Sequence, residues 1–201
     1  MAYTIGLTGS IGSGKSTVSK IIKEQGIEII DADEISRGLT SKGSPIVSEL
    51  VEAFGEGILD IEGQLDRRKL AEVAFSHEDN REKLSEIVTL KVVAIIEDIR
   101  EDMINCEGRI VVFDIPLLFE YGFNNKFDEI WTVVADTETR FLRAHLRDGI
   151  SKEDFDKRDA SQVSQLEKIA NSDIVIYNDK ELSDLIDKVK AEVNRVKILS
   201  E

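Results

Sequence analysis

The feature that most constrains this chain is a glycine-rich stretch near its start, GSIGSGKST at residues 9–17, which fits the pattern G-x-x-x-x-G-K-[S/T]. An apolar run at residues 3–7 precedes it, and apolar residues at helical spacing follow it, which predicts a strand, a tight turn and the start of a helix. Glycines allow the backbone N–H groups of such a turn to point inward, and the helix dipole adds partial positive charge. The stretch therefore predicts a site for a nucleoside triphosphate rather than an ordinary βα turn.

We refer to residues 9–17 as the phosphate loop. Lys15 is expected to reach the β- and γ-phosphates of the nucleotide, and the Ser16 hydroxyl is expected to complete the coordination shell of Mg²⁺. The residues predicted to contact the nucleotide in this loop are Gly9, Gly12, Ser13, Gly14, Lys15, Ser16 and Thr17.

Charge and cysteine content restrict the possible partners. The 201 residues include 26 basic and 40 acidic side chains, a net charge of −14, which argues against nucleic acid or an anionic membrane as a partner. The single cysteine excludes an intramolecular disulfide and suits a reducing compartment. We therefore expect a cytoplasmic protein that meets a small anionic ligand with local basic residues.

Two carboxylates follow the second predicted strand, residues 27–30. Asp31 and Asp33 come at the carboxyl end of that strand, where open α/β sheets bind their ligands. Asp33 can orient an attacking hydroxyl group and accept its proton during phosphoryl transfer. It can equally be the N-cap of a helix that begins at Glu34. The spacing alone favours neither interpretation.

A third apolar run, residues 109–114, is typical of a buried parallel strand and ends in Asp114. An acid in this position usually holds Mg²⁺, directly or through water. The apolar residues after it, including Leu117, either line a pocket or pack in the core. The N-K-x-D pattern at residues 125–128 resembles a guanine-reading motif, but it precedes the strand predicted at 129–135, so we interpret it as a coincidence.

The most basic segment, residues 137–162, reads as a helical hairpin. Arg140, Arg143 and Arg147 share one face of its first helix. Such a hairpin can close as a lid that brings arginines to a transferring phosphoryl group. The alternative is a salt-bridged surface helix, because acidic residues alternate with the basic ones. The established phosphate loop favours the lid.

Together these elements predict an α/β fold: a P-loop NTPase-like parallel sheet flanked by helices, with an inserted helical substrate subdomain and an arginine-bearing helical lid. The nucleotide-binding core is expected at residues 1–59, 106–136 and 163–201, the helical subdomain at 60–105 and the lid at 137–162. The last strand, 172–178, should bring Asn178 close to the phosphate loop, where folds of this kind often contact the base. An amphipathic helix at 181–199 closes the chain.

Several blocks of the sequence resemble the dephospho-CoA kinase family, in the family's order and over nearly the whole chain. They are residues 6–17, Asp31-Ala32-Asp33, Leu65-Asp66-Arg67, residues 114–120 (DIPLLFE), Arg143 with Arg147, Arg158 with Gln162, and the segment from Asp173 to Asn178. The sequence departs from the family at Thr89 and Leu90, where His-Pro is usual, and at residues 177–179, where Asp-Asn-Gly is usual.

The resemblance implies transfer of the ATP γ-phosphate, with Mg²⁺, to the 3′-hydroxyl group of dephospho-CoA. It implies that Asp33 is the base, that Arg67 binds substrate phosphates, and that Arg143 and Arg147 act from the lid. The implied partner is this small-molecule substrate, and we expect a monomer or a weak homo-oligomer. Two alternatives are a kinase for another nucleoside-like or small hydroxyl acceptor, which the change at Thr89 and Leu90 favours, and a non-catalytic ATP-binding protein.

Overall fold

The computed structural model describes residues 1–74 and 76–200, without the side chain of residue 104. The chain divides into two compact units, and each is described by itself. One combines Met1–Asp31 with the chain from Asp102 onward, and the other is Ala32–Glu101. The helical unit thus begins at Ala32, whereas the sequence suggested a helical subdomain from residue 60.

The first unit is built on a five-stranded parallel sheet, as the fold class predicted. Its strands lie in the order β2 (Glu28–Asp31), β3 (Ile110–Asp114), β1 (Tyr3–Gly9), β4 (Glu129–Val134) and β5 (Ile174–Tyr177). Leu7 of β1 is in register with Asp114 of β3 and with Trp131 of β4. The carboxyl ends of the strands meet at one edge of the sheet, and the central β1 delivers the phosphate loop to that edge.

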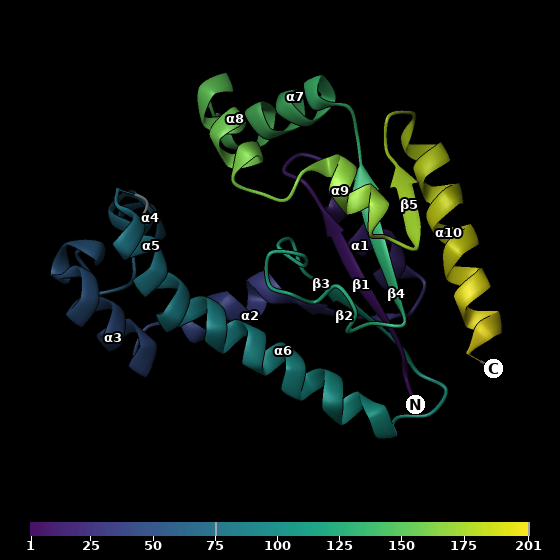
Figure 1. Cartoon of the computed structure of the whole chain (residues 1–201), viewed down its shortest axis with the longest axis horizontal. Coiled ribbons are helices and arrows are strands. Elements are labelled where there is room, and N and C mark those ends of the chain that lie inside the picture. The colour runs from purple at the N-terminus through teal and green to yellow at the C-terminus, as the bar shows by residue number, and fades with distance from the viewer. Residues whose placement is uncertain (75, 201) are drawn as a thin grey trace. The chain divides into compact units, whose positions relative to one another are not determined.

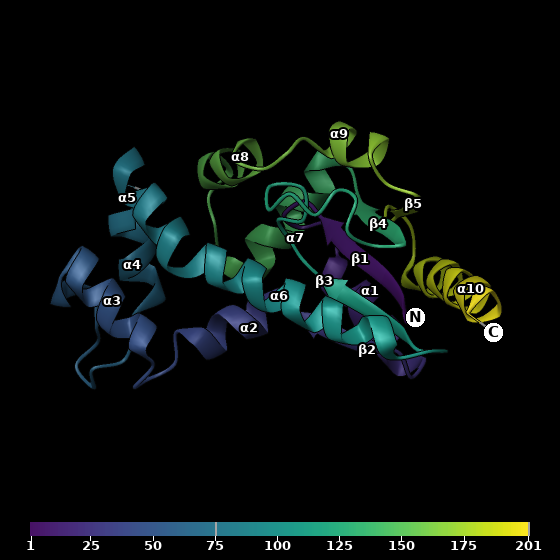
Figure 2. The ribbon, with the colours of Figure 1, turned by 60° about the horizontal axis from the view of Figure 1, so that its bottom comes forward.

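Helices cover this sheet as the apolar periodicity predicts. α1 (Lys15–Glu24) and α10 (Leu182–Leu199) pack together on one face, and α9 (Gln165–Ala170) lies on the other (Figures 1 and 2). The hairpin of α7 (Thr137–Asp148) and α8 (Lys152–Ala160) lies beyond the carboxyl ends of the strands (Figure 1). Apolar residues from β1, β4, α1 and α10 fill the core of this unit, namely Ile5, Leu7, Val18, Ile22, Trp131, Val133, Val189 and Val193.

The second unit is helical. It contains α2 (Ala32–Leu39), α3 (Pro45–Phe54), a 3₁₀ turn at Glu56–Ile58, α4 (Arg67–Ala74), α5 (Glu78–Leu84) and most of α6 (Leu90–Asp102). Ile46, Leu50, Ile58 and Leu70 form its buried cluster. Asp66 caps α4 by accepting hydrogen bonds from the N–H groups of Arg68 and Lys69, as its position before the helix predicts.

Two helix boundaries in this unit bear on the predictions. α2 begins at Ala32, so Asp33 lies in its first turn, and of the two interpretations of Asp33 the one that made it the N-cap of a helix starting at Glu34 does not hold. Within the region 60–105 that was expected to be helical, α5 and α6 are joined by a π-helical turn at Ser85–Thr89. A 3₁₀ turn at Met103–Asn105 follows α6. In the part of the chain that the structure describes, no helix combines the length and apolar character needed to cross a membrane.

Candidate active site

The phosphate loop makes its turn with two glycines in left-handed conformations. Gly12 has φ 76° and Gly14, the residue before α1, has φ 93°. A Cβ atom on Gly12 would overlap the Arg140 carbonyl oxygen, and one on Gly14 would overlap the Asn178 amide nitrogen. These two glycines are therefore required both by backbone conformation and by the close approach of α7 and of the segment after β5.

Lys15 and Asp114 come together at the carboxyl edge of the sheet. The Lys15 ammonium group forms an ion pair with one Asp114 oxygen, and the Ser19 hydroxyl donates a hydrogen bond to the other. The Asp114 residue is only 4% exposed, so its carboxylate is compensated by these two groups rather than by bulk solvent. A triphosphate that binds in the loop must compete with Asp114 for the Lys15 charge.

The donor set at this edge fits Mg²⁺. Ser16 is exposed at the start of α1, and Asp114 supplies carboxylate oxygens; hydroxyl and carboxylate oxygens are ligands that Mg²⁺ prefers. Over residues 1–74 and 76–200, no group of three or more His, Cys, Asp or Glu side chains is gathered in a way that could hold a metal ion. A metal held by one or two protein oxygens and by substrate phosphates is the usual mode for Mg²⁺.

Ser13 and Asn178 connect the loop to the end of β5. The Asn178 side-chain amide donates to the Ser13 carbonyl oxygen at 2.8 Å, which confirms that the last strand ends beside the phosphate loop. Arg143 donates to the Asn178 carbonyl oxygen at 3.0 Å and to the Ser13 carbonyl oxygen at 3.5 Å. The Ser13 hydroxyl is buried and has no hydrogen-bond partner among the described residues.

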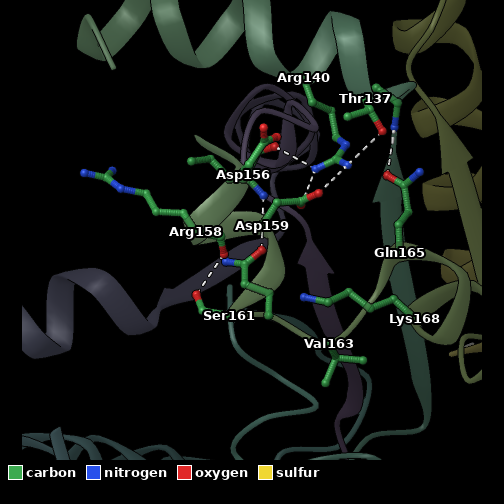
Figure 3. Close-up of polar contacts among 12 residues, drawn as sticks. Thr137, Arg140, Asp156, Arg158, Asp159, Ser161, Val163, Gln165 and Lys168 are labelled. Atoms are coloured by element: carbon green, nitrogen blue, oxygen red, sulfur yellow. Dashed lines mark hydrogen bonds and ion pairs between the residues drawn. The ribbon is translucent and has the colours of Figure 1, made fainter. Parts of the chain in front are cut away.

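The three arginines of α7 have different environments. Arg140 is buried and forms a two-point ion pair with Asp159 of α8 (Figure 3). Arg143 is half-buried against the phosphate loop. Arg147 is exposed and pairs with Asp148 of its own helix, which raises the pKa of the arginine and lowers the pKa of the aspartate. The predicted helical hairpin is confirmed. On the face of α7 that carries the three arginines, Arg140 is buried, Arg143 contacts the phosphate loop and Arg147 is exposed to solvent.

The residues expected to contact the acceptor lie in several segments. Leu117 lies in the connection from β3 to β4 and is half-buried, and its carbonyl oxygen accepts a hydrogen bond from the Tyr121 N–H at 2.9 Å. Asp33 is exposed in the first turn of α2. Arg67 is exposed at the start of α4, where it donates to the Thr40 hydroxyl at 2.7 Å.

Sequence reasoning left some polar residues of this region without a role. Ser19 lies one helical turn after Lys15, and this spacing is a signal that could have placed it beside Asp114. Gln162 accepts a hydrogen bond from the phosphate loop, and Lys168 is fully buried. Nothing in the local sequence indicates the hydrogen bond of Gln162 or the burial of Lys168. The prediction that the N-K-x-D pattern is a coincidence is confirmed. Asp128 accepts a hydrogen bond from the Thr4 N–H at 2.7 Å, at the end of β1 opposite to the phosphate loop.

Known proteins resemble this chain over most of its length. The family model described as dephospho-CoA kinase matches residues 3–184. A dephospho-CoA kinase of Fusobacterium nucleatum subsp. nucleatum is 40% identical over 186 residues, which cover 92% of this chain and 94% of the relative. Another, from Listeria monocytogenes serotype 4b, is 41% identical over 182 residues, covering 90% of this chain and 91% of the relative.

Solved structures share the fold. TT1252 from Thermus thermophilus is 31% identical and superposes with a TM-score of 0.78, covering 96% of this chain and 97% of that one. A dephospho-CoA kinase from Campylobacter jejuni, 24% identical, superposes with a TM-score of 0.75 over the full length of both chains and supports the fold alone. With a phosphate loop at the carboxyl edge of a parallel sheet and a family match over nearly all of its length, this chain belongs to the dephospho-CoA kinase family, which transfers phosphate from ATP to dephospho-CoA.

Proposed function

We propose that this chain transfers the γ-phosphate of ATP to the 3′-hydroxyl group of dephospho-CoA through the residues described above. The observation that carries the proposal is the meeting of Lys15 and Asp114 at the phosphate loop. A lysine that can leave a carboxylate for a triphosphate, beside a buried acid at the end of the neighbouring strand, is the arrangement that phosphoryl transfer in P-loop enzymes uses.

In the proposed reaction the acceptor oxygen attacks the γ-phosphorus. A new O–P bond forms, the bond to the leaving ADP oxygen breaks, and the hydroxyl proton passes to the Asp33 carboxylate. Lys15 and the backbone N–H groups of the loop stabilise the charge that develops on the phosphate oxygens. Mg²⁺, held by Ser16 and Asp114, supplies further charge neutralisation when bound. Metal removal with EDTA should abolish turnover, and added Mg²⁺ should restore it.

The basic residues outside the loop have proposed roles as well. Arg143 is already held against the loop and is suited to a nucleotide phosphate, and Arg147 is exposed and can reorient toward a ligand. Asn178 supports the loop through its hydrogen bond to the Ser13 carbonyl oxygen, and it is assigned to the base of ATP. Arg67, at the start of α4, and Leu117 are assigned to the acceptor. A cytoplasmic location and a monomer or weak homo-oligomer stay predictions.

The test is ADP release measured with Mg·ATP, with and without dephospho-CoA. Lys15→Ala and Asp33→Asn should each lower kcat by on the order of a hundredfold or more, because an electrostatic or an acid–base contribution is lost. Lys20→Ala and Glu34→Gln are matched controls. Lys20 is an exposed residue of α1, the helix of Lys15, and Glu34 is an exposed residue of α2, the helix of Asp33; neither has a role in the proposal. Both controls should keep the wild-type rate.

The outcomes separate the alternatives. ADP release that depends on dephospho-CoA supports the proposal, and a near-wild-type rate for Asp33→Asn removes the role of that residue as the base. If a panel of other hydroxyl compounds stimulates ADP release and dephospho-CoA does not, the enzyme is a kinase for another acceptor. ATP binding with no turnover for any acceptor indicates the non-catalytic alternative.

A further inference from the structure

Ile11 of the phosphate loop is contacted at its N–H group, its carbonyl oxygen and its side chain by residues of the hairpin and of the segment that follows it. Its N–H group donates to the Gln162 side-chain oxygen at 3.3 Å, and its carbonyl oxygen accepts from the Arg140 guanidinium at 3.4 Å. Its side chain packs against the buried cluster of Ala144, Ile150 and Phe155. The conformation of the loop at this residue therefore depends on groups from residues 137–162.

The guanidinium of Arg140 is itself fixed before it meets the loop. It is 2% exposed and makes two parallel contacts with Asp159, at 2.6 Å and 3.0 Å, and a third with the Thr137 hydroxyl at 3.3 Å (Figure 3). Such a two-point pair between arginine and a carboxylate restricts the orientation of both groups. The contact with the Ile11 carbonyl oxygen is thus made by a rigid partner.

The backbone beside Gln162 is anchored as well. The N–H of the next residue, Val163, donates to the Glu120 carboxylate at 2.7 Å. The same carboxylate oxygen lies 3.4 Å from the ammonium group of Lys168, which is fully buried in α9. Gln162 therefore extends from a segment that is tied to the β3–β4 connection and to α9.

We propose that Gln162 is a positioning residue for the ATP site: it holds the Ile11 amide so that the phosphate loop keeps the shape that binds the triphosphate. Together with Arg140 it joins the base of the hairpin to the loop. The inference rests on the proposed function, because it assigns Gln162 to the ATP site of that reaction.

The test compares Gln162→Leu with Gln165→Leu. Gln165 is a matched control: it follows Gln162 by three residues, and its side-chain oxygen also accepts a backbone N–H, that of Ala135 at 3.4 Å, a residue outside the phosphate loop (Figure 3). Gln162→Leu should accelerate hydrogen exchange at the Ile11 amide by on the order of tenfold, the effect of losing one hydrogen bond. It should also lower kcat/KM for ATP by about tenfold, with the KM for dephospho-CoA unchanged. Gln165→Leu should change neither quantity.

Two further variants keep the test decisive. Gln162→Glu retains an acceptor oxygen and should keep the slow exchange of the Ile11 amide. Gln162→Asn has a shorter side chain and should accelerate this exchange as the leucine variant does. It replaces the leucine variant in the test if that variant does not fold. Unchanged Ile11 exchange in the leucine or asparagine variant would overturn the inference. An equal rise in the KM for both substrates, together with a lowered melting temperature, would also overturn it, because these effects indicate a merely structural role. The exchange measurement needs no turnover, so failure of the proposed function is recognised separately, by the lack of dephospho-CoA-dependent ADP release in the wild type.

Discussion

At the scale of single residues, the most unusual environment in the described chain is that of Lys168. Its side chain is fully buried, and burial lowers its pKa, while the nearby carboxylates of Glu120 and Asp159 oppose this shift. The positive charge of Arg140 near the ammonium group also lowers the pKa of Lys168, as burial does. The Glu120 side chain is 18% exposed, so water still reaches one partner of the pair and not the other.

This asymmetry predicts different costs for removing either partner. Glu120→Gln leaves a buried ammonium group without its nearest opposite charge and should lower the free energy of unfolding by about 3 kcal/mol. Lys168→Met should cost less, because the remaining carboxylate is partly hydrated and still accepts from Val163. Urea unfolding at pH 7 of both variants and of the double variant measures these costs. A larger loss in Lys168→Met than in Glu120→Gln contradicts the prediction.

The same pair predicts a pH dependence. Burial holds the pKa of Lys168 in the folded chain below the value of 10.5 that is usual for lysine. Between these two values the unfolded chain binds a proton that the folded chain does not, so this group makes stability rise with pH. The rise should be larger in Glu120→Gln, where the loss of the carboxylate lowers the pKa further, and absent in the double variant with Lys168→Met. Unfolding free energies at pH 7 and pH 9.5 test this.

At the scale of elements, one carboxylate connects α10 to the sheet. Glu129, at the start of β4, accepts hydrogen bonds from the Tyr3 hydroxyl of β1 at 2.9 Å, from the Trp131 indole at 2.8 Å and from the Arg195 guanidinium of α10 at 2.8 and 2.6 Å. Burial by itself would raise the pKa of Glu129, but the hydrogen bonds from Arg195, Trp131 and Tyr3 lower it. The amino-terminal edge of the sheet is thereby joined to the last helix.

Tyr3 reports on this connection. Burial and the hydrogen bond to Glu129 raise its pKa from 10.0 to about 12. Between these values the unfolded chain loses the phenol proton and the folded chain keeps it, so stability falls as the pH rises, by at most about 1.4 kcal/mol per pH unit. Tyr3→Phe should remove this part of the decline. We would compare urea unfolding of the two proteins at pH 9 and pH 11; an identical decline in both would show that Tyr3 does not contribute.

At the scale of the whole molecule, the two compact units carry separate parts of the proposed reaction. The phosphate loop, Asp114 and the hairpin belong to the first unit, and Asp33 and Arg67 belong to the second. The residues proposed for the nucleotide thus lie in the first unit. Those proposed for the acceptor lie in the second unit, except Leu117, which lies in the first. Protection by each substrate should follow the same division.

Hydrogen exchange should show this division. A non-hydrolysable ATP analogue with Mg²⁺ should slow exchange in residues 9–17, and dephospho-CoA should slow it in the second unit around Arg67. Arg67→Ala should raise the KM for dephospho-CoA by about tenfold, the loss expected for a hydrogen bond to a charged group. Arg68→Ala is its control, because that neighbouring side chain is 90% exposed and pairs with Glu72. Equal effects of the two substitutions would argue against acceptor binding by Arg67.

The sequence by itself determined the local elements and the chemistry of the phosphate loop. The glycine-rich motif and the apolar residues around it place β1 and α1 correctly, and the basic segment with its helically spaced arginines places the hairpin, because these signals act over a few residues. Asp114 could be predicted at the site because strand ends of a parallel sheet meet at one edge.

Only the tertiary structure decided the rest. It buried Arg140 and Lys168, turned Gln162 toward Ile11 and set the start of the helical unit at Ala32. Arginine and lysine usually lie at the surface, so the residue type alone predicts exposure for Arg140 and Lys168. Their burial here depends on partners far away in the chain, such as Glu120 for Lys168, and no local pattern encodes such a distant pairing.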